Sequence, residues 1–374
     1  MMRAILFTIL IVFCITSSGC MDQLDIEEET LTLLLAFGMN DEQKLTVLQT
    51  NPIFDKEIKS KTQALMVKSD SIRDSKIKLN TFTNGKIVGG KIQVVVMEKD
   101  VVMRQNPLPL MDVLYRDPKN SLNAAVIVLD SSIENLKDIV NRPDRPRISV
   151  YLKELVETNQ ETNRTVETTL RSFYYQMLEK GKTPSLTEVK IVRDDMIGIA
   201  GIALLNESGI YKTKLSENES VYLLLLQDEA MLPAPISIPI PMKLPESNAG
   251  KDKLSFDIMK IKHTIKPEYY SGRFHFTIQL DMTISLTEKM FLLNVQSQLP
   301  ALEKIIAQKI KNDIERVVQK IQKHRIDPIG LGIYARAYSY PQWKEVKDNW
   351  GEELARADIE IETKVKVRSF GVIK

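Results

Sequence analysis

Cysteine and histidine are scarce in this chain, with two cysteines and three histidines among 374 residues. Cys14 lies in an N-terminal apolar run that is expected to be removed, which leaves Cys20 alone, so no intramolecular disulfide is predicted in the mature protein. His263, His275 and His324 are far apart, and none has a second histidine or a cysteine at metal-ligand spacing. We therefore expect no metal site and favour structural roles for the three histidines.

An excess of charge of one sign is also missing, because 51 basic residues face 49 acidic ones. Nucleic-acid binding usually requires a basic stripe, so this balance argues against a nucleic-acid partner. It also argues against electrostatic adhesion to anionic lipid. A transmembrane helix needs about 20 consecutive apolar residues, and no segment after the N-terminal run is a candidate.

Recognisable catalytic motifs are absent from the sequence as well. Residues 85–91 (GKIVGGK) match the glycine and lysine spacing of a phosphate-binding loop, but Ile92 stands where that motif needs Ser or Thr, and a strand follows instead of a helix. A glycine-rich turn between two strands is the favoured interpretation. No G-x-S-x-G sequence is present, and the adjacent acids at 194–195 and 27–29 are interpreted as solvated. We predict no catalytic residue, no cofactor site and no enzyme activity.

What the chain does have is a secretory signal that ends at a cysteine. Arg3 is followed by an apolar run over 4–15, then by small residues up to Gly19 and by Cys20. This arrangement resembles a bacterial lipobox, with Ser17 where Leu is usual. Residues 1–19 are therefore predicted to be a signal peptide, and Cys20 to carry S-diacylglycerol and N-palmitoyl groups. A secreted protein with Cys20 as a free thiol is the alternative.

Residues 20–187 are predicted to form an N-terminal α+β domain. β-branched and apolar runs indicate strands over 31–38, 44–50, 92–97 and 123–129. Helices are expected over 107–115, from Ser132 as N-cap to Val140, and over 149–180.

Residues 188–232 are predicted to form a small β-rich middle domain, with strands over 197–205 and 220–226. Five prolines then occur between Pro233 and Pro245. Because proline lacks a backbone N–H, residues 233–249 should be an edge or an extended connector, and we place a domain boundary there.

Residues 250–374 are predicted to form a C-terminal α+β domain with a largely antiparallel sheet. Apolar and polar residues alternate over 274–286 and again over 359–367, as in strands with one buried face. A long amphipathic helix is expected over 300–324, and a shorter one over 343–354. The fold class is therefore α+β, with several domains and mixed sheets packed with helices.

Two features of this last region have alternative interpretations. Trp343 and Trp350 could form an aromatic ligand clamp or a membrane-facing patch, but their helical spacing with Val346 and Leu354 favours core packing. The polar face of the 300–324 helix could be solvated surface or could dock a partner domain. The sequence does not separate those two possibilities.

Three segments together resemble one family, the Ger(x)C lipoproteins, which are the C subunits of nutrient germinant receptors in spore-forming bacteria. The first is GCMDQLDIEEETLTLLLAFGMN, in which Met21 replaces the usual Trp while Asp22 stays. The second is GIAGIALLNESGIYKTKLSENESVYLLLLQD. The third and most specific is DPIGLGIYARAYSYPQWKEVKDNWGEELARADIEIETKVKVRSFG, with its Asp-Pro-x-Gly, Pro-x-Trp and Asn-Trp sequences. The resemblance covers nearly the whole chain.

The resemblance implies a three-domain α+β lipoprotein that is tethered through Cys20 to the outer face of the spore inner membrane. It implies two integral membrane partners, one of them similar to amino-acid transporters, and a role in nutrient-triggered germination without catalysis. Which nutrient is sensed, and whether this subunit binds it, is not indicated. The alternatives are a solute-capturing lipoprotein of a membrane transporter and an exported enzyme that acts on the cell wall.

Overall fold

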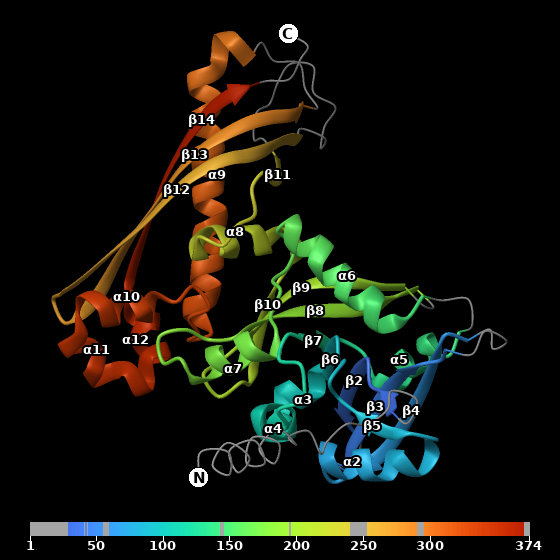
Figure 1. Cartoon of the computed structure of the whole chain (residues 1–374). Coiled ribbons are helices and arrows are strands. Elements are labelled where there is room, and N and C mark those ends of the chain that lie inside the picture. The colour runs from blue at the N-terminus through green and yellow to red at the C-terminus, as the bar shows by residue number, and fades with distance from the viewer. Residues whose placement is uncertain are drawn as a thin grey trace, which may run out of the picture.

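The computed structural model describes residues 29–40, 42, 44–54, 60–142, 146–193, 196–239, 253–289 and 295–369. These residues form an α+β structure with one eight-stranded sheet, one four-stranded sheet and a small two-stranded sheet (Figure 1). The strands are β1 (Glu29–Leu31), β2 (Leu34–Met39), β3 (Leu45–Pro52), β4 (Thr62–Ser69), β5 (Lys86–Val88), β6 (Val94–Glu98), β7 (Ala125–Leu129), β8 (Ser185–Val192), β9 (Met196–Leu205), β10 (Tyr211–Leu215), β11 (Ala234–Pro239), β12 (Lys253–Tyr270), β13 (Arg273–Lys289) and β14 (Asp358–Ser369). The α-helices are α2 (Ile72–Leu79), α3 (Lys99–Arg104), α4 (Leu108–Arg116), α5 (Ile133–Val140), α6 (Ile148–Glu161), α7 (Leu170–Leu178), α8 (Glu217–Gln227), α9 (Val295–Lys323), α10 (Leu331–Tyr338), α11 (Tyr340–Val346) and α12 (Trp350–Arg356), and the 3-10 helices are η2 (Asn80–Phe82) and η4 (Lys347–Asn349).

The eight-stranded sheet is mixed, with the order β10-β9-β8-β7-β6-β2-β3-β4. Its centre is parallel, because β2, β6, β7 and β8 run in the same direction, and both margins are antiparallel. The central strands VVVME and AVIVL are buried along their whole length. Helices α2, α3, α4 and α7 pack on one face and α5 and α6 on the other, which explains why these strands are continuously apolar.

Most of the expected elements of this sheet are present. β2 pairs with β3, and Ser132 caps α5 by accepting a hydrogen bond from the Asn135 backbone N–H at 3.3 Å, as expected. The sheet continues through β8, β9 and β10, and so residues 188–215 extend the sheet that β2 and β3 begin. The division of the chain near residue 187 stays a prediction.

The helix expected over 343–354 is interrupted, because the 3-10 helix η4 separates α11 from α12. Two further expected elements are wrong. The single helix over 149–180 is two helices, α6 and α7, because the threonines between them bond elsewhere: Thr165 Oγ1 donates to Gly201 O at 3.1 Å and Thr168 Oγ1 to Ser185 O at 2.7 Å. The strand expected over 220–226 is helix α8, which begins at a capping box formed by Ser216 and Glu219.

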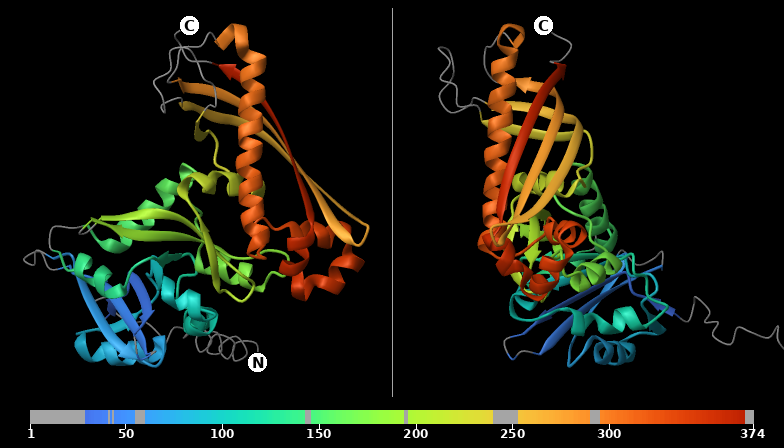
Figure 2. Two further views of the ribbon diagram at one scale, coloured as in Figure 1. Left: turned by 180° about the vertical axis from the view of Figure 1, so that it is seen from behind. Right: turned by 90° about the vertical axis from the view of Figure 1, so that its left-hand side faces the viewer.

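The four-stranded sheet has the order β11-β12-β13-β14, antiparallel except for the parallel β13–β14 pair. Helix α9 lies along one face of it (Figure 2). Within the described ranges β11 is the edge strand of this sheet, and Pro235 and Pro239 leave few N–H groups on its free edge. Residues 240–249 of the expected connector lie outside the described residues.

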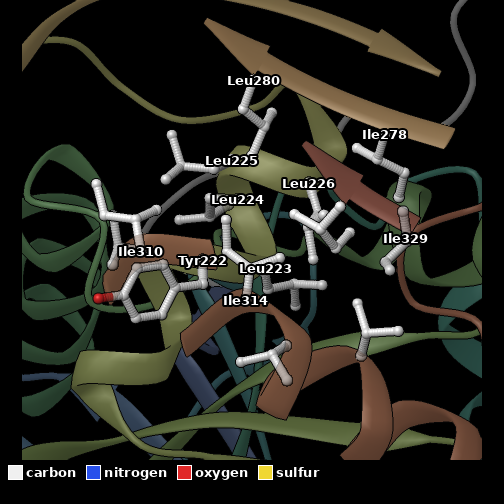
Figure 3. Close-up of a cluster of buried hydrophobic side chains, with 14 of the residues drawn as sticks. Tyr222, Leu223, Leu224, Leu225, Leu226, Ile278, Leu280, Ile310, Ile314 and Ile329 are labelled. Atoms are coloured by element: carbon white, nitrogen blue, oxygen red, sulfur yellow. The ribbon is translucent and has the colours of Figure 1, made fainter. Parts of the chain in front are cut away.

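Helix α8 links the core of the four-stranded sheet to the larger sheet. Its residues from Val221 to Leu226 are all buried, and they pack against α9 and β13 (Figure 3). The same apolar cluster includes Ile202 and Leu204 of β9. None of the helices in the described ranges has the length and apolar character needed to cross a membrane.

Candidate functional site

Cys20, the one residue to which the sequence assigns a chemical role, lies outside the described residues. The described chain begins at β1, which pairs in parallel with β5. Residues 21–28 lie between Cys20 and Glu29, and an extended chain of that length reaches roughly 30 Å. The surface beside β1 and β5 therefore lies within that distance of the Cys20 backbone.

The glycine-rich segment 85–91 is a turn between two strands, as interpreted from the sequence. Lys86–Val88 form β5, a turn follows, and β6 begins at Val94, so no helix follows the glycines. A Cβ at Gly90 would lie 2.8 Å from the Lys119 carbonyl oxygen. The glycine thus permits close packing of two loops.

The three histidines lie in three separate places. His275 stacks on Tyr270 with ring centroids 3.5 Å apart, and its Nδ1 lies 3.3 Å from Asp358. Burial lowers the pKa of His263. Burial also lowers the pKa of His324, and nearby lysines add to that effect. Within the described ranges no group of three or more His, Cys, Asp or Glu side chains is arranged to hold a metal ion.

A buried charged cluster lies near the carboxyl ends of the parallel strands. Glu188, whose side chain is fully buried, accepts hydrogen bonds from Lys99 Nζ at 3.2 Å, Lys214 Nζ at 3.1 Å and the Tyr211 hydroxyl at 2.8 Å. Asp130 Oδ2 lies 3.2 Å from the same Lys99 Nζ. Ligands bind at this edge in many open α/β sheets, but here the carboxylates and ammonium groups bind one another.

The pKa shifts of Lys99 and Tyr211 in this charged cluster favour their ordinary protonation states. Burial tends to lower the pKa of Lys99, but the Glu188 and Asp130 carboxylates outweigh burial and raise it. Burial and the Glu188 carboxylate raise the pKa of Tyr211. At neutral pH the lysine therefore stays charged and the tyrosine stays protonated.

Glu98, at the end of β6, joins two neighbouring segments. Its carboxylate accepts hydrogen bonds from the Ile133 N–H at 2.6 Å and from the Met39 N–H at 3.2 Å. Burial raises its pKa. A Cβ at Gly38 would lie 2.0 Å from Glu98 Oε2, so the glycine that closes the first apolar stretch makes room for this carboxylate.

The most densely bonded site is the Asp327 junction, formed by the Asp327 carboxylate and its four donors. Oδ1 accepts from the N–H groups of Gly330 at 2.7 Å and Leu331 at 3.0 Å, and Oδ2 accepts from the Gly332 N–H at 2.8 Å and the Trp350 indole N–H at 2.7 Å. Asp327 is fully buried. Burial raises its pKa, and the four donors act in the opposite direction. The Asp-Pro-x-Gly and Asn-Trp sequences are thus parts of one structural unit.

The Asp327 junction also ties the C-terminal elements to the larger sheet. The backbone N–H of Asp327 donates to Thr183 Oγ1 at 3.0 Å, and the Thr183 N–H donates to Asp327 O at 2.8 Å. Beside this pair, the backbones at Gly181 and Gly332 approach so closely that a Cβ at Gly332 would lie 2.6 Å from the Gly181 Cα. Two glycines are required where these segments cross.

An ion pair beside the Asp327 junction makes a second connection. Arg336 of α10 donates to both oxygens of Glu179, at 2.8 and 3.2 Å, and the Gly181 N–H donates to Glu179 Oε1 at 3.0 Å. Burial tends to raise the pKa of Glu179, but the Gly181 N–H and the Arg336 guanidinium outweigh burial and lower it.

Both tryptophans belong to the core, as favoured from their spacing. Trp343 and Trp350 are only 5% and 4% exposed. Trp350 makes edge contacts with Phe274 and Phe276 of β13, at ring centroid distances of 5.3 and 6.5 Å. Neither ring is available as a surface clamp.

A pocket of about 260 Å³ lies between α8, α9 and β11. Its polar groups are bonded to one another: the Tyr222 hydroxyl donates to Asp313 Oδ2 at 2.9 Å, Arg316 forms an ion pair with the same carboxylate, and Arg164 donates to the neutral Asn218 Oδ1 at 2.7 Å. The sequence did not decide whether the polar face of α9 is solvated or docks a partner domain. In the structure, part of this face contacts α8 of the same chain. Lys320 of α9 also lies 3.2 Å from Glu219 of α8.

Sequence reasoning did not single out Glu188, Glu98 or Asp327 as buried groups. A lone acid inside an apolar strand (SLTEVKIV) was the available signal for Glu188, and an acid at the end of IQVVVM was the signal for Glu98. Asp327 was within the most specific motif, but its partners Thr183 and Trp350 are distant in sequence.

Comparison with known proteins identifies relatives along the whole described chain. Residues 22–191 match the family model described as spore germination protein N-terminal domain, and residues 200–371 match the model described as spore germination B3/GerAC like, C-terminal. Spore germination protein KC of Bacillus subtilis (strain 168) is 22% identical over 331 residues, covering 82% of this chain and 78% of the relative. Spore germination protein YndF of the same organism is 24% identical over 292 residues, covering 76% and 68%.

A solved structure shares the fold. The crystal structure of the GerBC protein superposes with a TM-score of 0.58 and 17% identity, covering 89% of this chain and 96% of that chain. The match supports the α+β architecture, with mixed sheets and the helix-backed C-terminal sheet.

Proposed function

Because the chain belongs to the Ger(x)C family of spore germination proteins, we propose that it is the lipid-anchored, non-catalytic C subunit of a nutrient germinant receptor. The family supports a role in spore germination. One observation carries the proposal: the two family models follow each other along the chain and together cover residues 22–191 and 200–371.

The arrangement of polar groups supports a role in assembly. The buried carboxylates of Glu188, Glu98 and Asp327 are all engaged by donors within the protein, and they join strands, a helix and the two larger sheets. Buried carboxylates that are bonded in this way hold the strands, the helix and the sheets that they join in place. In the proposed receptor, this rigid body contacts the extramembrane parts of two integral membrane subunits, one of them transporter-like.

Spores that lack this protein provide the direct test of the function. Dipicolinate release should be lost in response to particular single nutrients, while a trigger that bypasses receptors still releases it. An unchanged response to every nutrient, in a strain in which related receptors are also deleted, would contradict the receptor assignment.

The anchor is tested separately through Cys20. We propose that acylation of Cys20 holds the protein on the outer face of the spore inner membrane. Cys20→Ala should abolish fatty-acid labelling and move the protein to the soluble fraction, because no helix of the described ranges is long and apolar enough to cross a membrane. Continued labelling of the Cys20→Ala protein would disprove this anchor.

The alternative, a lipoprotein that captures a solute for a transporter, is distinguished by binding. Such a protein should bind one nutrient tightly on its own, whereas in the pocket beside α8 Arg316 and the Tyr222 hydroxyl are already bonded to Asp313. Isothermal titration of the purified protein with single nutrients separates the two functions.

A further inference from the structure

We propose that the acidic segment of residues 21–28 docks into a groove between α2 and α4. This α2–α4 groove has a volume of about 690 Å³ and is lined by Arg73, Lys76, Ile77 and Asn80 on one side and by Leu110 and Arg116 on the other. Both helices pack on the same face of the eight-stranded sheet (Figure 1).

The α2–α4 groove combines an apolar surface with unpaired positive charge. Ile77 is 62% exposed, although it lies on a helix that packs on the sheet. Arg116 is neutralised by Asp112 at 2.6 Å, whereas Arg73 and Lys76 form no ion pair with any residue of the described ranges. Asp117 also lines the groove and accepts a hydrogen bond from the Lys119 N–H at 3.0 Å, so three cations face two carboxylates in the lining. A peptide that fits here should carry carboxylates next to apolar side chains.

The described chain begins beside this groove. β1 pairs with β5 from Glu29 to Leu31, and the Ile87 N–H of β5 donates to Asn80 Oδ1 at 2.9 Å. Asn80 lines the groove, and a depression lined by Thr32 and Ile87 shares Arg73 and Lys76 with it. Residues that precede Glu29 therefore start within reach of the two unpaired cations.

The composition of residues 21–28 (MDQLDIEE) matches the groove. Asp22, Asp25, Glu27 and Glu28 supply four negative charges, and Leu24 and Ile26 supply apolar side chains. Tethering makes docking intramolecular, with an effective concentration in the millimolar range for a short flexible link. The same acids are repelled by anionic lipid headgroups, so the groove is the better partner for them than a membrane surface.

Docking would shorten the tether between the folded body and Cys20. The docking itself is independent of the proposed function, but its consequence rests on that function: with Cys20 acylated, the α2–α4 end of the protein would be held towards the membrane. The opposite end, where α9 and the four-stranded sheet extend, would then point away.

Photo-crosslinking from residue 24 in the processed protein tests the docking. A benzophenone amino acid replaces Leu24, and peptide mapping is expected to locate the crosslink on α2 or α4. The double variant Arg73→Glu and Lys76→Glu should lower the crosslink yield, because it reverses the charges that attract the acidic segment. We expect a decrease of about five-fold, since each exposed ion pair contributes little binding free energy. Adding Asp22→Lys and Asp25→Lys to that background should restore the yield.

A matched control reverses two charges elsewhere. Arg171→Glu and Lys190→Glu make the same change in net charge at exposed positions outside the groove and should leave the yield unchanged. A crosslink on other elements, on a second copy or on another protein would overturn the proposal, as would a yield that the groove variants do not alter. The experiment uses both the acylated chain and an unacylated Cys20→Ser chain and needs no germinating spore, so its failure is distinct from failure of the proposed function.

Discussion

At the scale of single residues, Asp327 shows how a buried carboxylate can be structural. All four of its contacts are N–H donors, so an amide in its place would direct an NH₂ group at one of them. We expect Asp327→Asn to lower the free energy of unfolding by about 2–4 kcal/mol, as measured by denaturant titration. The same change at the exposed Asp100 should cost within about 0.5 kcal/mol. Equal effects at both positions would show that the Asp327 junction contributes little.

At the scale of elements, the ion pair between α10 and Glu179 gives a pH-dependent contribution. The pKa of Glu179 is lowered in the folded protein, because the Gly181 N–H and Arg336 outweigh burial. Its stabilising contribution is therefore present above the ordinary glutamate pKa of 4.5 and is lost as the pH falls through the lower folded value. Glu179→Gln should cost about 1–2 kcal/mol at pH 7 and almost nothing well below pH 4.5. Denaturant titrations of both proteins at several pH values measure this, and a difference independent of pH would contradict it.

Elements with a local signal could be predicted from the sequence. β6 and β7 follow from continuous β-branched runs, α5 from its Ser132 cap, and β13 from strict alternation. α8 could not be predicted, because residues 221–226 are buried all round and a short apolar run has no helical periodicity to separate it from a strand. The break between α6 and α7 depends on Thr165 and Thr168 bonding to β9 and β8, which no local pattern reveals.

At the scale of the whole molecule, the two larger sheets are joined by contacts between distant parts of the chain. Thr183 meets Asp327, and Glu179 meets Arg336, in each case across about 150 residues of sequence. The family motif at the C-terminus indicated the fold by resemblance, but the sequence alone did not show that its residues face the larger sheet. The sequence therefore predicts the C-terminal motif, but it does not predict that the residues of this motif join the two larger sheets.

Whether that junction makes the two sheets unfold together can be tested at the Gly181–Gly332 crossing. A Cβ at Gly332 would lie 2.6 Å from the Gly181 Cα and 2.7 Å from the Trp350 Nε1, so Gly332→Ala must push the two segments apart. We expect a loss of about 1–3 kcal/mol, and in calorimetry a single transition that broadens or separates into two as the sheets uncouple. Gly198→Ala is the matched control: the nearest neighbour of its Cβ is Val192 Cγ2 at 3.6 Å, an ordinary contact, and alanine suits a strand better than glycine. If Gly332→Ala behaves like Gly198→Ala, the crossing does not couple the sheets, and the apolar cluster around α8 must join them by itself.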